Sequence, residues 1–143
     1  KEGTSGMYQR KVRFSDTDCQ GHVFNANYFV YADDAITDFL EELGLVYAEM
    51  VRRGHDMVLA RAECDFRSAA TLGETMDVAV SVIRVGNTSF TLGFVVAATG
   101  DGRVVARGRE VYVILDRASG TPTPLPDYVR GAVAGPTADD GAS

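Results

Sequence analysis

The sequence has no tryptophan, two histidines and two cysteines among its 143 residues, and no apolar run approaches the roughly 20 residues that cross a bilayer. Cys19 and Cys64 form neither a disulfide framework nor a zinc-type spacing. The start of the sequence lacks the basic segment and apolar stretch of a secretory signal. These absences favour a cytoplasmic protein with reduced cysteines and no membrane association.

Positive charge is also scarce, because 14 Lys and Arg against 20 Asp and Glu leave a formal net charge of −6. This charge argues against non-specific nucleic-acid binding, which needs basic surface to neutralise phosphates. A phosphorylated ligand would therefore need a local arginine cluster, although any single surface arginine is more often just solvated. The candidates in the strand region are Arg61, Arg67, Arg84, Arg103, Arg107 and Arg109.

The length predicts one domain, since 143 residues is close to the commonest domain size. Hydrophobic residues at 45% and charged residues at 24% are ordinary for a globular protein. We expect residues 1–6 to be a tag or a disordered N-terminus and residues 7–130 to fold. Residues 131–143 are mostly Gly, Ala, Pro, Thr and Asp, so we expect a disordered tail there.

Apolar residues recur at intervals of three and four over residues 26–43, which predicts a long amphipathic helix. Asn25 or Asn27 can cap its start, and Gly44 can end it in a left-handed turn. The apolar stripe consists of Tyr28, Phe29, Ala32, Ala35, Ile36, Phe39, Leu40 and Leu43.

Alternation with a period of two predicts one strand before this helix and four strands in a row after it. The expected strands are 8–14, 58–67, 76–82, 90–96 and 104–115, with a short second helix at 46–53. The pattern predicts an α+β fold in which the long helix lies across an antiparallel sheet. Because a second copy would cover an exposed sheet edge, we expect at least a dimer.

The chemically richest segment is residues 14–28, FSDTDCQGHVFNANY, which puts two aspartates, a glycine and a histidine into the loop before the helix. The first turn of a helix presents unpaired N–H groups that stabilise a negative oxygen developing on a carbonyl. A nearby carboxylate could attack that carbonyl or activate water. The same residues also fit a plain strand-to-helix loop, with Gly21 at a turn and Asn25 as the cap.

The run Asp-Thr-Asp-x-x-Gly-His-Val followed by Asn-Ala-x-Tyr resembles the 4-hydroxybenzoyl-CoA thioesterase branch of the hotdog superfamily. The order of the predicted elements over residues 7–116 is similar as well. The resemblance implies a hotdog domain at 7–130, with a long helix wrapped by an antiparallel sheet. It also implies hydrolysis of an acyl-CoA or acyl-carrier-protein thioester to free acid and thiol, without metal or other cofactor, by a homodimer assembled into a tetramer.

By this resemblance Asp18 is the catalytic carboxylate, acting as nucleophile or general base, and Asp16 is structural. The backbone N–H of Asn25 would polarise the thioester carbonyl. His22 could assist proton transfer, or it could be a loop residue held by backbone hydrogen bonds. The residues expected at the substrate, some from strands of a second subunit, are Phe24, Tyr28, Glu63, Thr88 and Ser89, although aromatic residues at this spacing are more often core.

Two other functions fit the same groove. A non-catalytic acyl-thioester-binding hotdog protein would bind the thioester without hydrolysing it. A 3-hydroxyacyl thioester dehydratase would need a histidine base with an acidic partner, which His22 fits poorly. Within the loop, a metal held by Asp16, Asp18 and His22 would need further ligands, and Cys19 has no second histidine close in sequence to activate it as a nucleophile.

Overall fold

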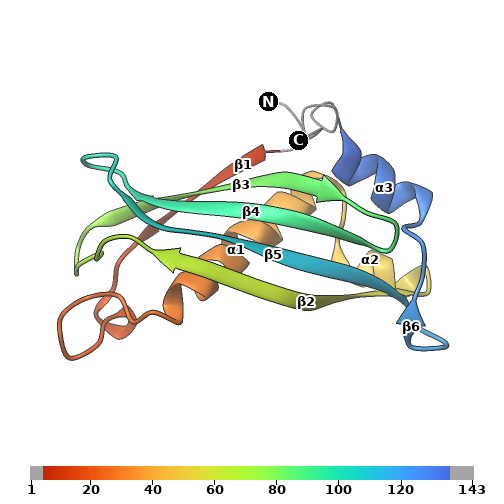
Figure 1. Ribbon diagram of the computed structural model, residues 1–143, viewed down its shortest axis with the longest axis horizontal. Helices are drawn as coiled ribbons and strands as arrows, with labels where there is room; N and C mark the ends of the chain where they lie inside the picture. Colours follow the sequence, from red (N-terminus) through yellow and green to blue (C-terminus); the bar gives the residue numbers. More distant parts are fainter. Residues whose placement is uncertain (1–4, 136–143) are drawn as a thin grey trace.

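The computed structural model describes residues 5–135, and in it one antiparallel sheet curls around one long helix (Figure 1). The strand order is β1-β3-β4-β5-β2, and β6 pairs with β5. The elements are β1 (Ser5–Lys11), a 3-10 helix (Phe14–Asp16), α1 (Asn27–Glu42), α2 (Tyr47–Arg52), β2 (His55–Phe66), β3 (Thr75–Val85), β4 (Ser89–Ala98), β5 (Val104–Asp116), β6 (Thr121–Pro122) and α3 (Asp127–Ala134). The predicted α+β arrangement of a long helix wrapped by an antiparallel sheet is confirmed.

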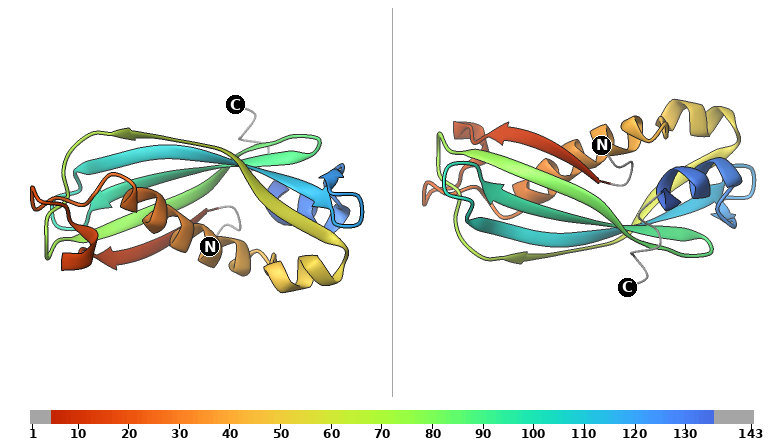
Figure 2. Two further views of the ribbon diagram at one scale, coloured as in Figure 1. Left: turned by 90° about the horizontal axis from the view of Figure 1, so that it is seen from below. Right: turned by 90° about the horizontal axis from the view of Figure 1, so that it is seen from above.

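Helix α1 packs its apolar stripe against β1, β3 and β4, and Figure 2 shows the sheet curling over it from two further sides. The buried residues of α1 are Tyr28, Tyr31, Ala32, Ala35, Ile36, Phe39 and Leu40. Spacings of three and four put these side chains on one side of the helix. Tyr31 is fully buried although it is outside the predicted stripe, because its hydroxyl donates to Asp16 at 2.8 Å.

The start of α1 differs from the prediction. Its N-cap residue is Ala26, and no side chain caps the helix. Asn27 is the first helical residue, and its side-chain amide donates to the carbonyl oxygen of Asp16 at 2.8 Å. The predicted asparagine cap is therefore wrong, because the preceding loop engages the Asn27 side chain. At the other end Gly44 has the expected left-handed conformation, with a φ of 88°.

The folded part of the chain begins earlier and ends later than the sequence predicted. Strand β1 spans Ser5–Lys11 rather than 8–14, and Ser5 and Gly6 pair with β3, so these two residues are ordered parts of the sheet. Helix α3 extends through Ala134, which overturns the prediction of disorder for 131–134. Residues 1–4 and 136–143 of the predicted termini lie outside the described residues.

Helix α3 was missed because its apolar positions are few. Val129 and Val133 are four residues apart and therefore share one face of the helix, and both are fully buried. Arg130 donates to the carbonyl oxygens of Gly86 and Asn87 at 2.9 and 3.3 Å. These contacts fasten the C-terminal helix to the β3–β4 turn.

Nothing within residues 5–135 covers one face and one long edge of the sheet. Successive side chains of a strand point to opposite faces, and Phe94 contacts Phe29 of α1, so Gly93 and Val95 face away from the helix. This open face carries a hollow of about 820 Å³ with Ala79 and Val95 among its lining residues. Strand β2 is an edge strand whose side chains are mostly exposed. No helix in residues 5–135 is long and apolar enough to cross a membrane.

Candidate active site

The connection between β1 and α1 carries both aspartates and folds back on itself. An antiparallel bridge joins Thr17 to Val23 and closes a small surface loop. Inside this loop the Asp18 N–H donates to the carbonyl oxygen of His22 at 2.8 Å. Gly21 has a φ of 80°, a conformation that glycine adopts without strain, which confirms the predicted turn.

The Asp18 carboxylate is partly exposed and stabilises its own turn. Its Oδ1 atom accepts hydrogen bonds from the N–H groups of Gln20 at 2.9 Å and His22 at 3.4 Å. Its Oδ2 atom accepts no hydrogen bond from the described part of the chain. A carboxylate that is oriented through one oxygen while the other stays free can act as a general base or a nucleophile.

Asp16 occupies the opposite environment and is 5% exposed. Its carboxylate accepts hydrogen bonds from the Tyr31 hydroxyl and the Arg13 N–H, and it forms an ion pair with Arg10 at 2.9 Å. Burial alone would raise the pKa of Asp16, but the hydrogen bonds from Arg13 and Tyr31 and the charge of Arg10 outweigh it and hold that pKa below its ordinary value. These contacts support the structural role predicted for Asp16.

Two N–H groups at the start of α1 are free to bind a ligand. The first bonds of the helical turn are donated by Asn27 and Tyr28 to the carbonyl oxygens of Phe24 and Asn25. The N–H groups of Asn25 and Ala26 donate to no described group of the chain. They lie at the positive end of the α1 dipole, where a developing oxyanion would be stabilised.

The other loop residues divide into exposed and buried. The His22 backbone accepts from and donates to Asp18, and its ring forms no hydrogen bond within residues 5–135. Phe24 is 52% exposed, whereas Tyr28 is 2% exposed and packs on Phe66. Within a single chain, Phe24 is therefore available to an acyl group and Tyr28 is a core residue.

Two residues expected at the substrate lie away from Asp18 in the single chain. Thr88 is in the β3–β4 turn and Ser89 begins β4, at the end of the sheet beside α3 and opposite the Asp18 loop (Figure 1). The 11 residues of β3 separate the two ends by roughly 30 Å. Glu63 lies in β2 and pairs with Arg61 at 3.0 Å and Arg109 at 3.4 Å. A role for Thr88 and Ser89 at the site would require a second copy of the chain.

The large hollow on the open sheet face does not coincide with the loop, because none of Asp18, His22 and Asn25 lines it. The candidate site is the loop, where the Asp18 carboxylate precedes the free N–H groups of Asn25 and Ala26. No group of three or more His, Cys, Asp or Glu side chains in the described chain is placed to hold a metal ion. Asp16, a candidate metal ligand by sequence, is instead engaged by Arg10 and Tyr31.

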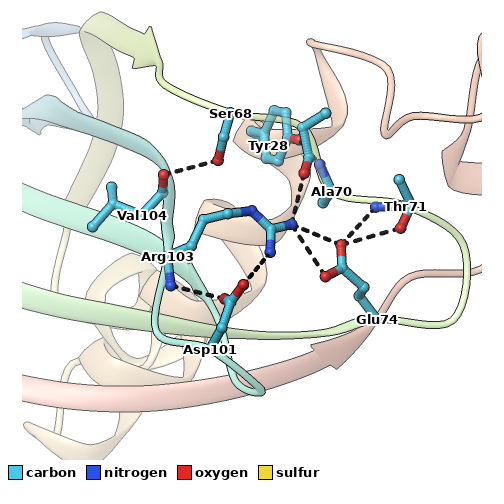
Figure 3. A network of polar contacts seen from close by, with 9 residues as sticks. Tyr28, Ser68, Ala70, Thr71, Glu74, Asp101, Arg103 and Val104 are labelled. Carbon is cyan, nitrogen blue, oxygen red and sulfur yellow. Dashed lines mark hydrogen bonds and ion pairs between the residues drawn. The ribbon is translucent and has the colours of Figure 1, made fainter.

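Sequence reasoning missed two polar features. Glu110 of β5 is 1% exposed and accepts a hydrogen bond from Tyr112 at 2.6 Å. Arg103 donates hydrogen bonds to Asp101, in the turn before β5, and to Ala69 and Glu74, in the connection between β2 and β3 (Figure 3). The sequence signal for Glu110 is its core-facing position in an alternating strand, and the sequence indicates Arg103 as a possible phosphate ligand.

Comparison with known proteins places this geometry in context. The thioesterase-like superfamily matches residues 12–133 of the chain. A protein named putative esterase from Aquifex aeolicus is 31% identical over 90 residues, which are 63% of this chain and 70% of that protein. A 1,4-dihydroxy-2-naphthoyl-CoA hydrolase from Thermosynechococcus vestitus is 27% identical over 129 residues, 87% of this chain and 88% of that protein. The solved structure of a gentisyl-coenzyme A thioesterase is 30% identical, with a TM-score of 0.79 over 90% of this chain and 100% of the other.

Proposed function

Because this chain belongs to the thioesterase-like superfamily and is an acyl thioester hydrolase of hotdog fold, we propose that it cleaves aromatic acyl-CoA thioesters with Asp18 as the catalytic carboxylate. The superfamily match and the relatives named as thioesterases or hydrolases confirm the predicted hotdog fold and the predicted thioester hydrolysis. The aromatic acyl group, the coenzyme A carrier and the residue roles are our proposal.

Two similarities support an aromatic acyl-CoA. The relatives at 27% and 30% identity are named for naphthoyl-CoA and gentisyl-CoA substrates, and the loop motif resembles the 4-hydroxybenzoyl-CoA branch. The exposed ring of Phe24, one residue before Asn25, offers an aromatic surface beside the proposed reacting carbonyl. An acyl-carrier-protein thioester is the competing substrate, and measuring thiol release from both kinds of thioester distinguishes the two.

In the proposed mechanism the thioester carbonyl oxygen accepts hydrogen bonds from the free N–H groups of Asn25 and Ala26. As a general base, the free Oδ2 of Asp18 takes a proton from water, the water oxygen attacks the carbonyl carbon, the C–S bond breaks, and the proton passes to the leaving sulfur to give free acid and thiol. As a nucleophile, Oδ2 attacks the carbonyl carbon itself, the C–S bond breaks with a solvent proton going to the sulfur, and water then hydrolyses the acyl–aspartyl anhydride to free acid and restores the carboxylate. A single donor to such an oxyanion contributes roughly 10²–10³-fold in rate. His22 acts here through its backbone, by holding the turn that orients Asp18.

We propose that the working unit is a dimer formed by antiparallel pairing of two β2 strands. β2 runs from the end of the sheet beside the β3–β4 turn, where His55 pairs with Asp116, to the end beside the Asp18 loop, where Phe66 pairs with Ala106. A two-fold axis across β2 reverses the second copy, so the β3–β4 turn of the partner approaches this chain's loop. That arrangement would bring Thr88 and Ser89 of the partner subunit to the site.

The open sheet face supports a further association into a tetramer. It carries Glu63 and Asp65 on β2 beside Arg107 and Arg109 on β5, around the hollow of about 820 Å³. A two-fold axis could place the acidic pair of one copy against the basic pair of another. This complementarity supports the tetramer that the family resemblance implies, and the tetramer stays a proposal. The cytoplasmic location stays a prediction from the sequence.

The function is tested by free-thiol release from a panel of aromatic and aliphatic acyl-CoAs and acyl-carrier-protein thioesters. We expect turnover on the aromatic acyl-CoAs and a fall of roughly 10²–10⁴-fold in Asp18→Asn. Asp38→Asn, an exposed acid on the outer face of α1, is the matched control and should keep full activity. Oligomeric state and unfolding midpoint are compared for all three proteins.

Each alternative has its own outcome in this assay. Unchanged turnover in Asp18→Asn would remove Asp18 from the mechanism. Wild-type protein that binds the thioesters without releasing thiol would be the non-catalytic binding protein. Loss of water from a 3-hydroxyacyl thioester, without thiol release, would identify the dehydratase, and a preference for the carrier-protein substrates would overturn the coenzyme A assignment.

A further inference from the structure

The guanidinium of Arg103 joins two chain segments behind the proposed site (Figure 3). Its Nη2 atom donates to the carbonyl oxygen of Ala69 at 2.8 Å and to both carboxylate oxygens of Glu74 at 2.9 and 3.1 Å. Its Nη1 atom donates to Asp101 at 2.9 Å. Arg103 precedes β5, whereas Ala69 and Glu74 belong to the connection between β2 and β3, so this contact is long-range.

Glu74 extends the network along that connection. Its Oε1 atom accepts hydrogen bonds from the N–H and the hydroxyl of Thr71 at 2.9 and 3.2 Å. The hydrogen bonds and charge of Arg103, together with the Thr71 N–H, lower the pKa of Glu74, so the pair stays ionised at neutral pH. Arg103 and Glu74 therefore define the shape of the segment 69–74 from both of its ends.

The same segment contacts both parts of the proposed site. The Val23 N–H donates to the carbonyl oxygen of Ala70 at 2.9 Å, and His22 forms an antiparallel bridge with Thr71. The Ala70 N–H donates to the Tyr28 hydroxyl oxygen at 3.3 Å, in the first turn of α1. One short stretch thus holds the loop that carries the catalytic carboxylate and the helix start that carries the free N–H groups.

We propose that Arg103, acting through Glu74 and the Ala69 carbonyl, is a positioning residue that sets the Asp18 loop relative to the start of α1. This inference rests on the proposed function of Asp18. A displacement of about 1 Å between reacting groups can cost on the order of 10²-fold in rate. A residue that only holds the catalytic loop in place can therefore control turnover without touching substrate. Arg103 and Glu74 are suited to this because their side chains are only 32% and 31% exposed.

The test compares Arg103→Met and the milder Glu74→Gln with Arg52→Met, which breaks an exposed ion pair within α2. Steady-state thiol release is measured with the aromatic acyl-CoA panel, well below the unfolding midpoint of each variant. We expect kcat to fall by roughly tenfold or more in Arg103→Met, by less in Glu74→Gln, and to stay unchanged in the control, with KM little altered throughout. Arg103→Lys keeps the charge and should recover part of the loss.

A double-mutant cycle with Asp18→Asn separates positioning from general stability. If Arg103 acts by placing Asp18, Arg103→Met costs much less in the Asp18→Asn background than in the wild type. An equal loss in both backgrounds, or no loss of kcat in Arg103→Met, overturns the proposal while Asp18 remains catalytic. If Asp18→Asn itself keeps full activity, the proposed function fails first and the positioning role fails with it.

Amide hydrogen exchange provides a readout that does not depend on activity. The Val23 N–H should exchange faster in Arg103→Met and Glu74→Gln than in the wild type, because its acceptor Ala70 lies in the released segment. The amide of Ile36, in the buried middle of α1, serves as the internal reference and should keep its protection. Unchanged exchange at Val23 in both variants would contradict the proposal.

Discussion

Asp16 and Asp18 are separated by a single residue, yet Asp16 is buried against Tyr31 and Arg10 while Asp18 lies on a surface turn with one carboxylate oxygen free. The carbonyl oxygen of Asp16 also accepts from Phe24 and from the Asn27 side chain, so this residue joins β1, the loop and the helix start. The first aspartate of the motif anchors the loop, and the anchored loop presents the second.

This contrast predicts that replacing aspartate by asparagine destabilises the chain strongly at position 16 and hardly at position 18. Asp16→Asn should lower the free energy of unfolding by about 2 kcal/mol, because it removes the buried carboxylate that pairs with the part-buried Arg10. Asp18→Asn should change it by less than about 0.5 kcal/mol, since an asparagine can still accept from Gln20 on the surface. Urea unfolding of the two variants measures both values, and equal losses would contradict the assignment of roles.

The lowered pKa of Asp16 also predicts how stability depends on pH. A carboxyl whose pKa is lower in the folded chain than its ordinary value of 3.8 adds stability that is fully present above that value. The contribution is lost as the pH falls through the lowered pKa. The unfolding midpoint of the wild type should therefore approach that of Asp16→Asn in strong acid, and a constant difference from pH 7 to pH 2 would argue against this linkage.

For Glu110 we expect stability to depend on pH in the opposite direction from Asp16. Burial raises its pKa above the ordinary 4.5, nearby Asp33 adds to the rise, and the hydrogen bond from Tyr112 offsets part of it. The folded chain thus binds this proton more tightly than the unfolded chain, so stability is highest below pH 4.5 and falls as the pH rises through the raised pKa. Glu110→Gln keeps the volume without the charge and should be more stable than the wild type at pH 7.

Calorimetry at pH 7 and pH 4 checks this prediction, because the gain should shrink at the lower pH. Glu110→Ala is the matched control and should be less stable than the wild type at both values, since it leaves a cavity and a buried Tyr112 hydroxyl without its acceptor. A loss of stability in Glu110→Gln at pH 7 would mean that the ionised carboxylate is itself stabilising.

The proposed β2 interface predicts a linked loss of association and activity. Val58 and Leu59 are 38% and 48% exposed on successive positions of the edge strand. The double substitution Val58→Lys, Leu59→Lys places like charges on both faces of a self-pairing edge and should weaken the dimer. Sedimentation equilibrium should then show monomer at concentrations where the wild type is dimeric, and thiol release should fall with the dimer fraction.

Val46→Lys is the control for this experiment, because Val46 is similarly exposed at 42% but precedes α2 rather than lying on β2. It should leave the oligomeric state and turnover unchanged. A monomeric double variant with full activity would show that the site is complete within one chain, which would remove Thr88 and Ser89 of the partner subunit from it.

The sequence could predict which residues lie together in the candidate site because the loop motif is contiguous. Asp18, Gly21, His22 and Asn25 lie within eight positions of each other, and the structure keeps them in one loop and helix start. The expected places of Glu63, Thr88 and Ser89 could not be derived this way, since a pattern along one chain does not contain the symmetry that relates it to a second copy.

The sequence by itself determined the α+β layout, because the change from a period of two to a period of 3.6 is a local property that decides which side chains share a face. It also determined which aspartates and N–H groups stand before the long helix. Only the tertiary structure decided that Asn27 binds the loop instead of capping α1, that Glu110 is buried, and that Arg103 reaches Ala69 and Glu74. These contacts join residues from separate segments, and neither hydrophobic period nor composition specifies such pairings before the chain has folded.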